Sequence, residues 1–316
     1  SKAFEFLDGI EIIRVAGHYG LHLMTPFLLN ANRDFDVVID DVAHAVPWFS
    51  SFFIRKPVVG QVHHLHESVL SLELPHYLAR FVALAERGLK YAYNVFVTVS
   101  ESTRHGLIEK FGIPAERIFV VPNGVDLDVY RPVCGKFSVP AVLWVGRVKR
   151  YKRVDHILMA FKIVKRNLSD AKLIVVGEGD YLPHLRLLSE RLGLHDVVFA
   201  GRVSEAEKVR LMSGAWVIVS ASIVEGWALT VTEAAACGTP CVAYDVPGLR
   251  DSVKDGETGL LAESGNVKDL AEKILTVLED AELREKLSRN ALEYAKQFSW
   301  DKTAEEFLKV LEGINK

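Results

Sequence analysis

Residues 225–240 read Glu-Gly-Trp-Ala-Leu-Thr-Val-Thr-Glu-Ala-Ala-Ala-Cys-Gly-Thr-Pro, and this stretch decides the fold. The apolar run 216–219 just before it predicts a buried strand. The Ala-rich run 230–237 predicts a helix that Gly238 ends, with Pro240 just beyond it. A strand, a short turn and a helix in this order are typical of one unit of a doubly wound α/β sheet.

Two carboxylates lie on either side of the predicted helix start. Glu225 falls in the loop after the strand, and Glu233 falls about one turn inside the helix. The N–H groups of a helix's first turn have no partner within the helix, and their partial positive charge attracts phosphate. The arrangement predicts a ligand with a phosphate between two sets of hydroxyl groups, although two glutamates at this spacing also occur on ordinary solvated helix faces.

Together with residues 241–251, this stretch resembles the Glu-x7-Glu signature of the retaining glycosyltransferases of family 4. The resemblance implies that Glu225 contacts the sugar hydroxyls and Glu233 the ribose of a nucleoside-diphosphate-sugar donor. It also implies donor contacts from the backbone N–H groups of Trp227, Ala228 and Leu229. The family's usual turn is Glu-Gly-Phe-Gly, so Trp227 keeps the bulky anchor while the Cβ of Ala228 narrows the room for the donor.

A basic loop follows an apolar strand upstream, where residues 143–153 read Leu-Trp-Val-Gly-Arg-Val-Lys-Arg-Tyr-Lys-Arg. By itself such a loop is an ordinary solvated charge run. Gly146, Arg147 and Lys152 match the family's Gly-Arg followed by a lysine five positions after the arginine, which implies that the two cations hold the donor diphosphate. Fixed cations stabilise the charge that develops on a departing nucleoside diphosphate.

Two glycine loops follow further strands, Gly-Glu-Gly at 177–179 and Gly-Arg-Val at 201–203. Each alone is an ordinary turn. Both resemble family loops that border the nucleotide, and the resemblance implicates Gly177 and Val203 in donor binding. Their order predicts that all these loops lie at the C-terminal ends of strands, where doubly wound sheets bind ligands.

Three histidines follow the predicted strand 57–62, in the order His63-His64-Leu65-His66. The family places one histidine here, near the anomeric carbon, and the resemblance assigns that role to His63. The alternatives are a hydrogen-bonded loop histidine and a metal site, but the spacing lacks the helical i,i+4 pair of a zinc motif. Neither a metal ion nor any cofactor beyond the donor is expected.

The chain of 316 residues alternates apolar strands with amphipathic helices, which predicts α/β layers with parallel sheets. The resemblance implies a GT-B fold of two facing Rossmann-like domains. Residues 1–132 would form the acceptor-side domain, 133–299 the nucleotide-sugar domain, and 300–316 a helix that crosses back to the first domain. Residues 8–15 resemble a strand that in the family follows a strand, a Gly-rich loop, a helix and another strand, so the first domain is expected to be incomplete and its effect on activity stays open.

Composition excludes some classes of partner. The net charge of −3 and the pI near 6.4 favour neither nucleic acid nor an anionic membrane. Three cysteines are too few for a disulfide framework and predict a reducing cytoplasm, and no apolar run is long enough to span a bilayer. The stretch from Trp48 to Lys56 combines aromatic and basic residues; packing on the first sheet is the favoured interpretation, and peripheral contact at the inner membrane face is the alternative.

The sequence thus predicts a retaining, metal-independent glycosyltransferase that moves a hexosyl group from a nucleoside-diphosphate-sugar to a hydroxyl of a glycan, glycolipid or small molecule. A sugar-nucleotide epimerase and a catalytically impaired nucleotide-sugar-binding protein are the alternatives. Turnover of donor alone would identify the first, and nucleotide binding without transfer the second. The sequence does not distinguish UDP, GDP or ADP, nor does it identify the acceptor or the oligomeric state.

Overall fold

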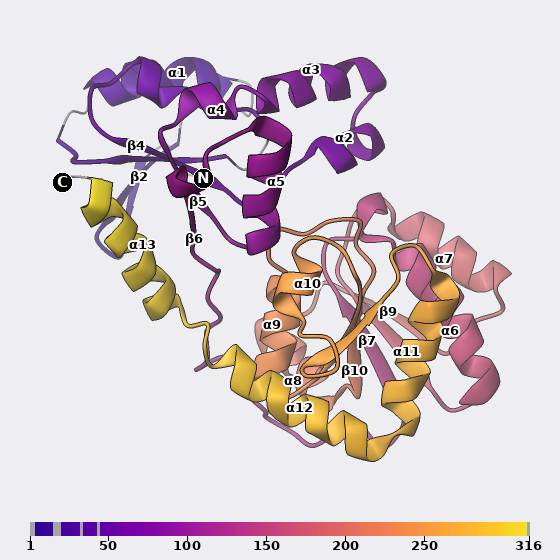
Figure 1. Ribbon diagram of the computed structural model, residues 1–316. Helices are drawn as coiled ribbons and strands as arrows, with labels where there is room; N and C mark the ends of the chain where they lie inside the picture. The colour runs from indigo at the N-terminus through magenta and orange to yellow at the C-terminus, as the bar shows by residue number, and fades with distance from the viewer. Residues whose placement is uncertain (1–3, 15–19, 32–33, 43–44, 315–316) are drawn as a thin grey trace.

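The computed structural model describes residues 4–14, 20–31, 34–42 and 45–314, which form two parallel sheets and one small hairpin (Figure 1). The strands are β1 (Phe4–Leu7), β2 (Ile10–Ile13), β3 (Val38–Asp41), β4 (Val58–Val62), β5 (Val95–Thr98), β6 (Ile118–Val120), β7 (Ala141–Val145), β8 (Lys172–Val176), β9 (Val197–Gly201), β10 (Val217–Ser220), β11 (Cys241–Tyr244) and β12 (Gly259–Ala262).

The α-helices are α1 (Gly20–Ala31), α2 (Glu67–Glu73), α3 (His76–Glu86), α4 (Leu89–Ala92), α5 (Glu101–Phe111), α6 (Val154–Asn167), α7 (Leu182–Arg191), α8 (Glu205–Gly214), α9 (Leu229–Ala236), α10 (Leu249–Ser252), α11 (Val267–Glu279), α12 (Ala281–Ala295) and α13 (Trp300–Ile314). Short 3-10 turns are η1 (Ser50–Phe52), η2 (Ala115–Arg117) and η3 (Arg150–Lys152).

The second half of the chain forms a six-stranded parallel sheet in the order β12-β11-β10-β7-β8-β9. The chain starts at the centre with β7, winds to one edge at β9, and returns to the other side of β7 with β10, which is the order of a doubly wound fold. The predicted strand and helix around residues 216–237 are confirmed as β10 and α9, and Gly238 follows with a φ of 73°. Every residue of β10 and β11 is buried, which explains why these strands are uninterrupted apolar runs.

The first half forms a four-stranded parallel sheet in the order β3-β4-β5-β6. The ring of Tyr93 packs on the middle of β4, where a Cβ on Gly60 would lie 2.4 Å from it. Of the aromatic stretch 48–56, Phe49 packs against this core, as expected, whereas Phe52 and Phe53 are exposed. The favoured interpretation of this stretch therefore holds for only part of it.

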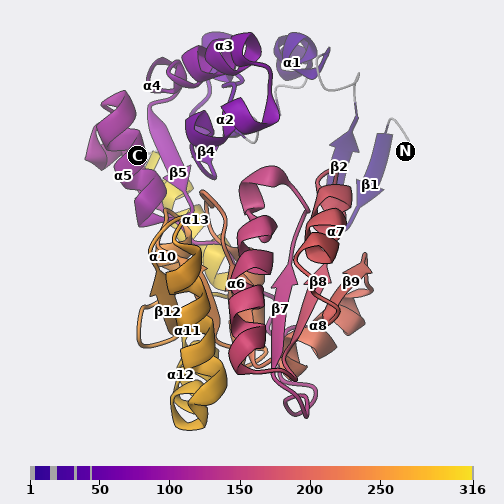
Figure 2. The same ribbon diagram turned by 90° about the vertical axis from the view of Figure 1, so that its right-hand side faces the viewer.

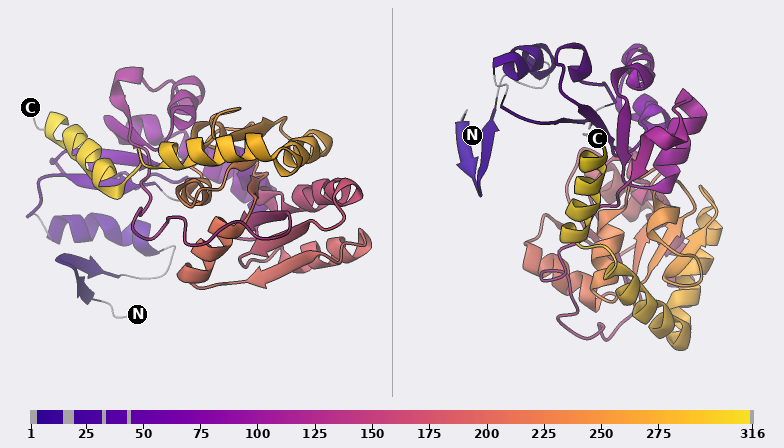
Figure 3. Two further views of the ribbon diagram at one scale, coloured as in Figure 1. Left: turned by 90° about the horizontal axis from the view of Figure 1, so that it is seen from below. Right: turned by 60° about the vertical axis from the view of Figure 1, so that its left-hand side comes forward.

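The predicted strand at residues 8–15 requires a correction. Residues Ile10–Ile13 are a strand, but β2 pairs antiparallel with β1 in a hairpin that stands apart from the four-stranded sheet (Figure 3). Asp8 and Gly9 turn the hairpin with φ values of 49° and 85°, as the Asp-Gly pair favours in two-residue turns. Val15 lies outside the described residues.

A long irregular segment and α13 connect the two halves. Residues 121–140, all described, contain no helix and no strand beyond one bridge between Val125 and Ser299. The chain returns along α13, which runs from the second half up to the first (Figures 1 and 2). The helix packs its apolar side on β4 and β5 with residues spaced three and four apart. These residues are Phe307, Val310, Leu311 and Ile314.

Candidate active site

The predicted diphosphate lysine and the first glutamate of the pair meet where the strand order reverses. Lys152 ends η3 in the loop after β7, and Glu225 lies in the loop after β10. The Nζ of Lys152 lies 2.6 Å from Oε1 of Glu225, and both side chains are less than a fifth exposed. Burial would lower the pKa of Lys152, but the Glu225 carboxylate raises it above its ordinary value. The site therefore holds a charged ammonium at the ligand-binding edge of the sheet.

The Gly-Glu-Gly loop packs against the basic loop at Gly146 and Val148, with no room for side chains on Gly177 or Gly179. A Cβ on Gly177, whose φ is 130°, would lie 1.8 Å from the carbonyl oxygen of Gly146. A Cβ on Gly179 would lie 2.1 Å from the carbonyl oxygen of Val148, whose N–H donates to Glu178. This contact fixes the backbone that carries Arg147, whose side chain is exposed. Val203, in the next loop, packs against the core of this half.

The loop that carries Glu225 is fixed in the same way. The backbone N–H of Glu225 donates to the carbonyl oxygen of Pro247. A Cβ on Gly248 would lie 2.2 Å from the carbonyl oxygen of Glu225. The hydroxyl of Ser222 donates to Oε1 of Glu225 at 2.6 Å. The carboxylate therefore has a fixed position before any ligand binds.

The backbone N–H groups of Ala228 and Leu229, which were predicted to contact the donor, have partners within the protein. The N–H of Ala228 donates to Oγ of Ser252 at 3.1 Å, and the N–H of Leu229 donates to the carbonyl oxygen of Trp227. The partner of Ala228 comes from α10, which lies against the start of α9, and the partner of Leu229 lies within the loop itself. The indole of Trp227 is buried, and its ring centroid lies 4.9 Å from that of Phe298, so it anchors the loop as expected.

Glu233 lies inside α9, as predicted, and is largely buried. Its Oε2 lies 3.2 Å from Nζ of Lys208 on α8, in an ion pair. Lys208 also contacts Glu205 and the ring of Tyr130. These three neighbours had no signal in the sequence, since Tyr130 lies in the irregular segment and the other two lie on an amphipathic surface helix.

The first half contributes the loop after β4. His63 lies at its start, and its Nε2 lies 3.0 Å from Oδ1 of Asp41 at the end of β3. The carbonyl oxygen of His63 approaches the Glu225 loop so closely that a Cβ on Gly226 would lie 2.1 Å from it. Gly226 is thus the position at which the two halves touch beside the lysine–glutamate pair.

His64 follows His63 in the same loop and lies near Lys152 and Arg147 of the second half. Burial, then the charges of His66, His63, Lys152 and Arg147, lower the pKa of His64 to about 3. The rings of His64 and His66 are 4.1 Å apart, and Oε1 of the buried Glu86 accepts the backbone N–H of His66. A neutral ring therefore faces the cations of the second half at neutral pH.

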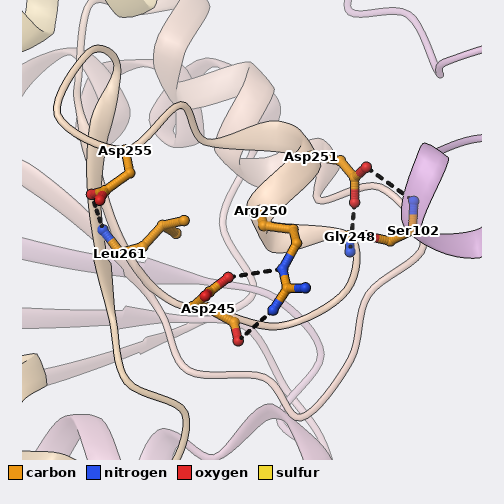
Figure 4. Close-up of polar contacts among 7 residues, drawn as sticks. All are labelled: Ser102, Asp245, Gly248, Arg250, Asp251, Asp255 and Leu261. Atoms are coloured by element: carbon orange, nitrogen blue, oxygen red, sulfur yellow. Dashed lines mark hydrogen bonds and ion pairs between the residues drawn. The ribbon is translucent and has the colours of Figure 1, made fainter.

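A second contact between the halves is made by Asp251 (Figure 4). One carboxylate oxygen accepts the N–H of Ser102 at 3.1 Å, and the other accepts the N–H of Gly248 at 3.0 Å. The same side chain thus caps α5 of the first half and α10 of the second. Ser100 also caps α5, because its hydroxyl accepts the N–H of Thr103.

Among the described residues there is no group of three or more His, Cys, Asp or Glu side chains that could hold a metal ion. Within the same residues, no helix has the length and apolar character needed to cross a membrane.

Comparison with known proteins agrees with this architecture. The family described as Glycosyl transferases group 1 matches residues 138–294, and Glycosyltransferase Family 4 matches residues 15–129. A D-inositol 3-phosphate glycosyltransferase of Thermomonospora curvata is 31% identical over 99% of this chain and 79% of its own length. Another, of a Nocardioides species, is 29% identical over 85% of this chain, which spans 66% of that relative's length.

Solved structures show the same fold. HepE of Anabaena, in complex with UDP and glucose, is 22% identical with a TM-score of 0.77, covering 94% of this chain and 83% of its own. Sucrose-phosphate synthase of Thermosynechococcus elongatus is 21% identical with a TM-score of 0.83, and the match covers 99% of this chain and 86% of that one. The fold and site therefore define a GT-B protein. The chain belongs to the group 1 glycosyl transferases.

Proposed function

We propose that the chain is a retaining glycosyltransferase that moves a sugar from a nucleoside-diphosphate-sugar to an acceptor hydroxyl. The observation that carries the proposal is the ion pair between Lys152 and Glu225 at the reversal of strand order. A donor diphosphate would take over the contact with Lys152 and be held by Arg147 as well. Glu225 would then be free to accept hydrogen bonds from the sugar, and Glu233 from the ribose.

In the proposed reaction the bond between the anomeric carbon and the diphosphate oxygen breaks, and its electron pair goes to the nucleoside diphosphate. Arg147 and Lys152 stabilise that charge as it forms. The acceptor oxygen attacks from the same face, and its proton passes to the departing phosphate. His63, which is held by Asp41, borders the anomeric centre from the first half. With two cations on the diphosphate, no divalent metal ion is required; a loss of activity on adding chelator would contradict this.

The test is isothermal titration of the chain with UDP-, GDP- and ADP-sugars, with Glu233→Ala in parallel. Binding of one nucleotide that is weakened in Glu233→Ala identifies the donor. Glu207→Ala is the matched control, because Glu207 forms a surface ion pair with Arg210 on α8. Equal nucleotide affinities for the unchanged chain, Glu233→Ala and Glu207→Ala would overturn the donor-site assignment.

Released nucleoside diphosphate is then measured with and without acceptors, of which D-inositol 3-phosphate is the first to test because it names two relatives. Release that depends on acceptor supports transfer. Turnover of donor alone would favour the epimerase, and binding without any turnover would favour a binding protein.

Location is part of the same proposal. The three cysteines are free, which supports a reducing cytoplasm. Phe52 and Phe53 are 64% and 47% exposed beside Arg55 and Lys56, which supports peripheral contact with an anionic membrane. Sedimentation with phosphatidylglycerol vesicles, but not with phosphatidylcholine vesicles, is expected, and it should weaken in the double variant Phe52→Ser, Phe53→Ser.

A further inference from the structure

The second glutamate of the pair belongs to a cluster of four side chains. It consists of Tyr130 from the irregular segment, Glu205 and Lys208 from α8, and Glu233 from α9. The Nζ of Lys208 lies 3.0 Å from Oε1 of Glu205 and 3.2 Å from Oε2 of Glu233. The same ammonium lies 4.8 Å above the ring of Tyr130, whose hydroxyl donates to Glu205.

The two carboxylates of the cluster differ in exposure. The Glu205 side chain is 58% exposed, whereas that of Glu233 is 15% exposed and its Oε2 is buried. Lys208 is the ion-pair partner of that buried oxygen. The small exposed part of the Glu233 side chain therefore does not include Oε2.

We propose that Lys208 is a positioning residue of the donor site, which holds Oε2 of Glu233 so that Oε1 is presented to the two ribose hydroxyls. This inference rests on the proposed function. A carboxylate that accepts two neighbouring hydroxyls must keep one orientation. The ammonium of Lys208 provides it through the contact with Oε2, and Tyr130 and Glu205 hold the ammonium in place.

A purely structural role is the competing explanation, because the same ion pair ties α8 to α9. The two roles differ in one measurable respect. Loss of a structural tie weakens the binding of every nucleotide alike. Loss of the positioning contact weakens only the binding of nucleotides that carry ribose hydroxyls.

The experiment measures affinity for UDP, GDP and ADP, and for the 2′,3′-dideoxy form of whichever diphosphate binds. In the unchanged chain the ribose form should bind more tightly than the dideoxy form. Lys208→Met keeps an unbranched apolar stem against Tyr130 but removes the charge. We expect it to weaken binding of the ribose form about tenfold and to leave the dideoxy form unchanged.

Two further variants complete the test. Lys208→Arg keeps the positive charge and should retain most of the preference for ribose. Arg210→Met, on the same helix, removes a surface ion pair with Glu207 and should change neither affinity. Thermal unfolding of each variant shows whether it is folded.

Three results would overturn the inference, and they are distinguishable. If Lys208→Met weakens both forms equally, the ion pair is structural. If the unchanged chain binds both forms equally, Glu233 does not contact the ribose although the donor site stands. If the unchanged chain binds no nucleotide, the proposed donor site itself is wrong.

Discussion

The two halves of the chain differ in how completely they are packed and in what they bring to the cleft. The six-stranded half has one continuous buried core, whereas the four-stranded half divides its buried side chains between two small clusters. Most of the large apolar side chains that are exposed belong to the first half, including Phe27, Phe81 and Tyr91. The proposed donor contacts lie mainly on the well-packed half, where their positions are fixed before a ligand arrives.

The first half reaches the site through only a few contacts. His63 touches the Glu225 loop at Gly226, and Ser102 donates to Asp251. Glu73 of α2 pairs with Lys149 at 3.5 Å, and α13 packs on the first sheet. Donor affinity should therefore depend on the second half alone, and turnover should depend on the junction. Each of the following changes tests one side of that division.

The largest effect is expected from Gly226→Val. Its side chain would meet the carbonyl group of His63 and separate the two halves. A misplacement of about 1 Å can cost about a hundredfold in rate. Donor turnover should therefore fall by about that factor, while nucleotide affinity changes little. Gly135→Ala is the control, because a Cβ there meets no atom within 4 Å. Unchanged turnover in Gly226→Val would show that the junction is not needed.

Lys152→Met should lower the affinity for nucleotide. It removes the ammonium that pairs with Glu225 and that would hold the diphosphate. Titration with nucleoside diphosphate should show affinity reduced about 10- to 100-fold, since hydrogen bonds to charged groups contribute about 1.5–3 kcal/mol. Lys149→Met, three residues away, removes the ion pairs that the described residues show with Glu73 and Asp180, and it should bind normally. Equal losses in both variants would point to general attraction by the basic loop.

The second half could be predicted closely from its sequence. The strand expected just before the Gly-Glu-Gly loop is β8, in which the apolar residues 173–176 follow the exposed Lys172. The end of α9 was predictable because Gly238 has the left-handed backbone that glycine favours. Local sequence is enough for such features.

The features that sequence missed depend on residues far apart. Ser102 and Asp251 are 149 positions apart, and nothing local in either stretch indicates that they meet. The same holds for Ser252, which takes the N–H of Ala228 that had been expected to contact the donor. The hairpin at residues 4–13 was missed for another reason, since the Asp8-Gly9 turn was interpreted as part of a strand.

A smaller effect is expected from Leu311→Ala in α13, which should loosen only the first half. Leu311 packs on the first sheet, so the free energy of unfolding should fall by about 2 kcal/mol, the lower end for this change. Leu308→Ala is the matched control, because Leu308 is 55% exposed, and it should change stability by less than about 0.5 kcal/mol. Urea unfolding measures both, and hydrogen exchange should rise in β4 and β5 but not in β7.

The smallest effect is expected from Asp251→Ala, which removes one side chain that caps helices in both halves. Loss of a capping carboxylate costs about 0.5–2 kcal/mol, so the contact between the two halves should weaken without unfolding of either half. Small-angle X-ray scattering should then show a larger radius of gyration, and nucleotide affinity should stay unchanged because Lys152 and Glu225 are untouched.

Asp245→Ala separates this effect from a general loss of charge in the same loop. Asp245 pairs with Arg250 on the surface, with both side chains half exposed (Figure 4). Exposed pairs of this kind contribute about 0–1 kcal/mol, and this one does not join the halves. A larger radius in Asp251→Ala alone would show that the Ser102 contact holds the halves together. An equal radius in both variants and the unchanged chain would assign that role to the other contacts between the halves, made by α13, Gly226 and the Lys149–Glu73 ion pair.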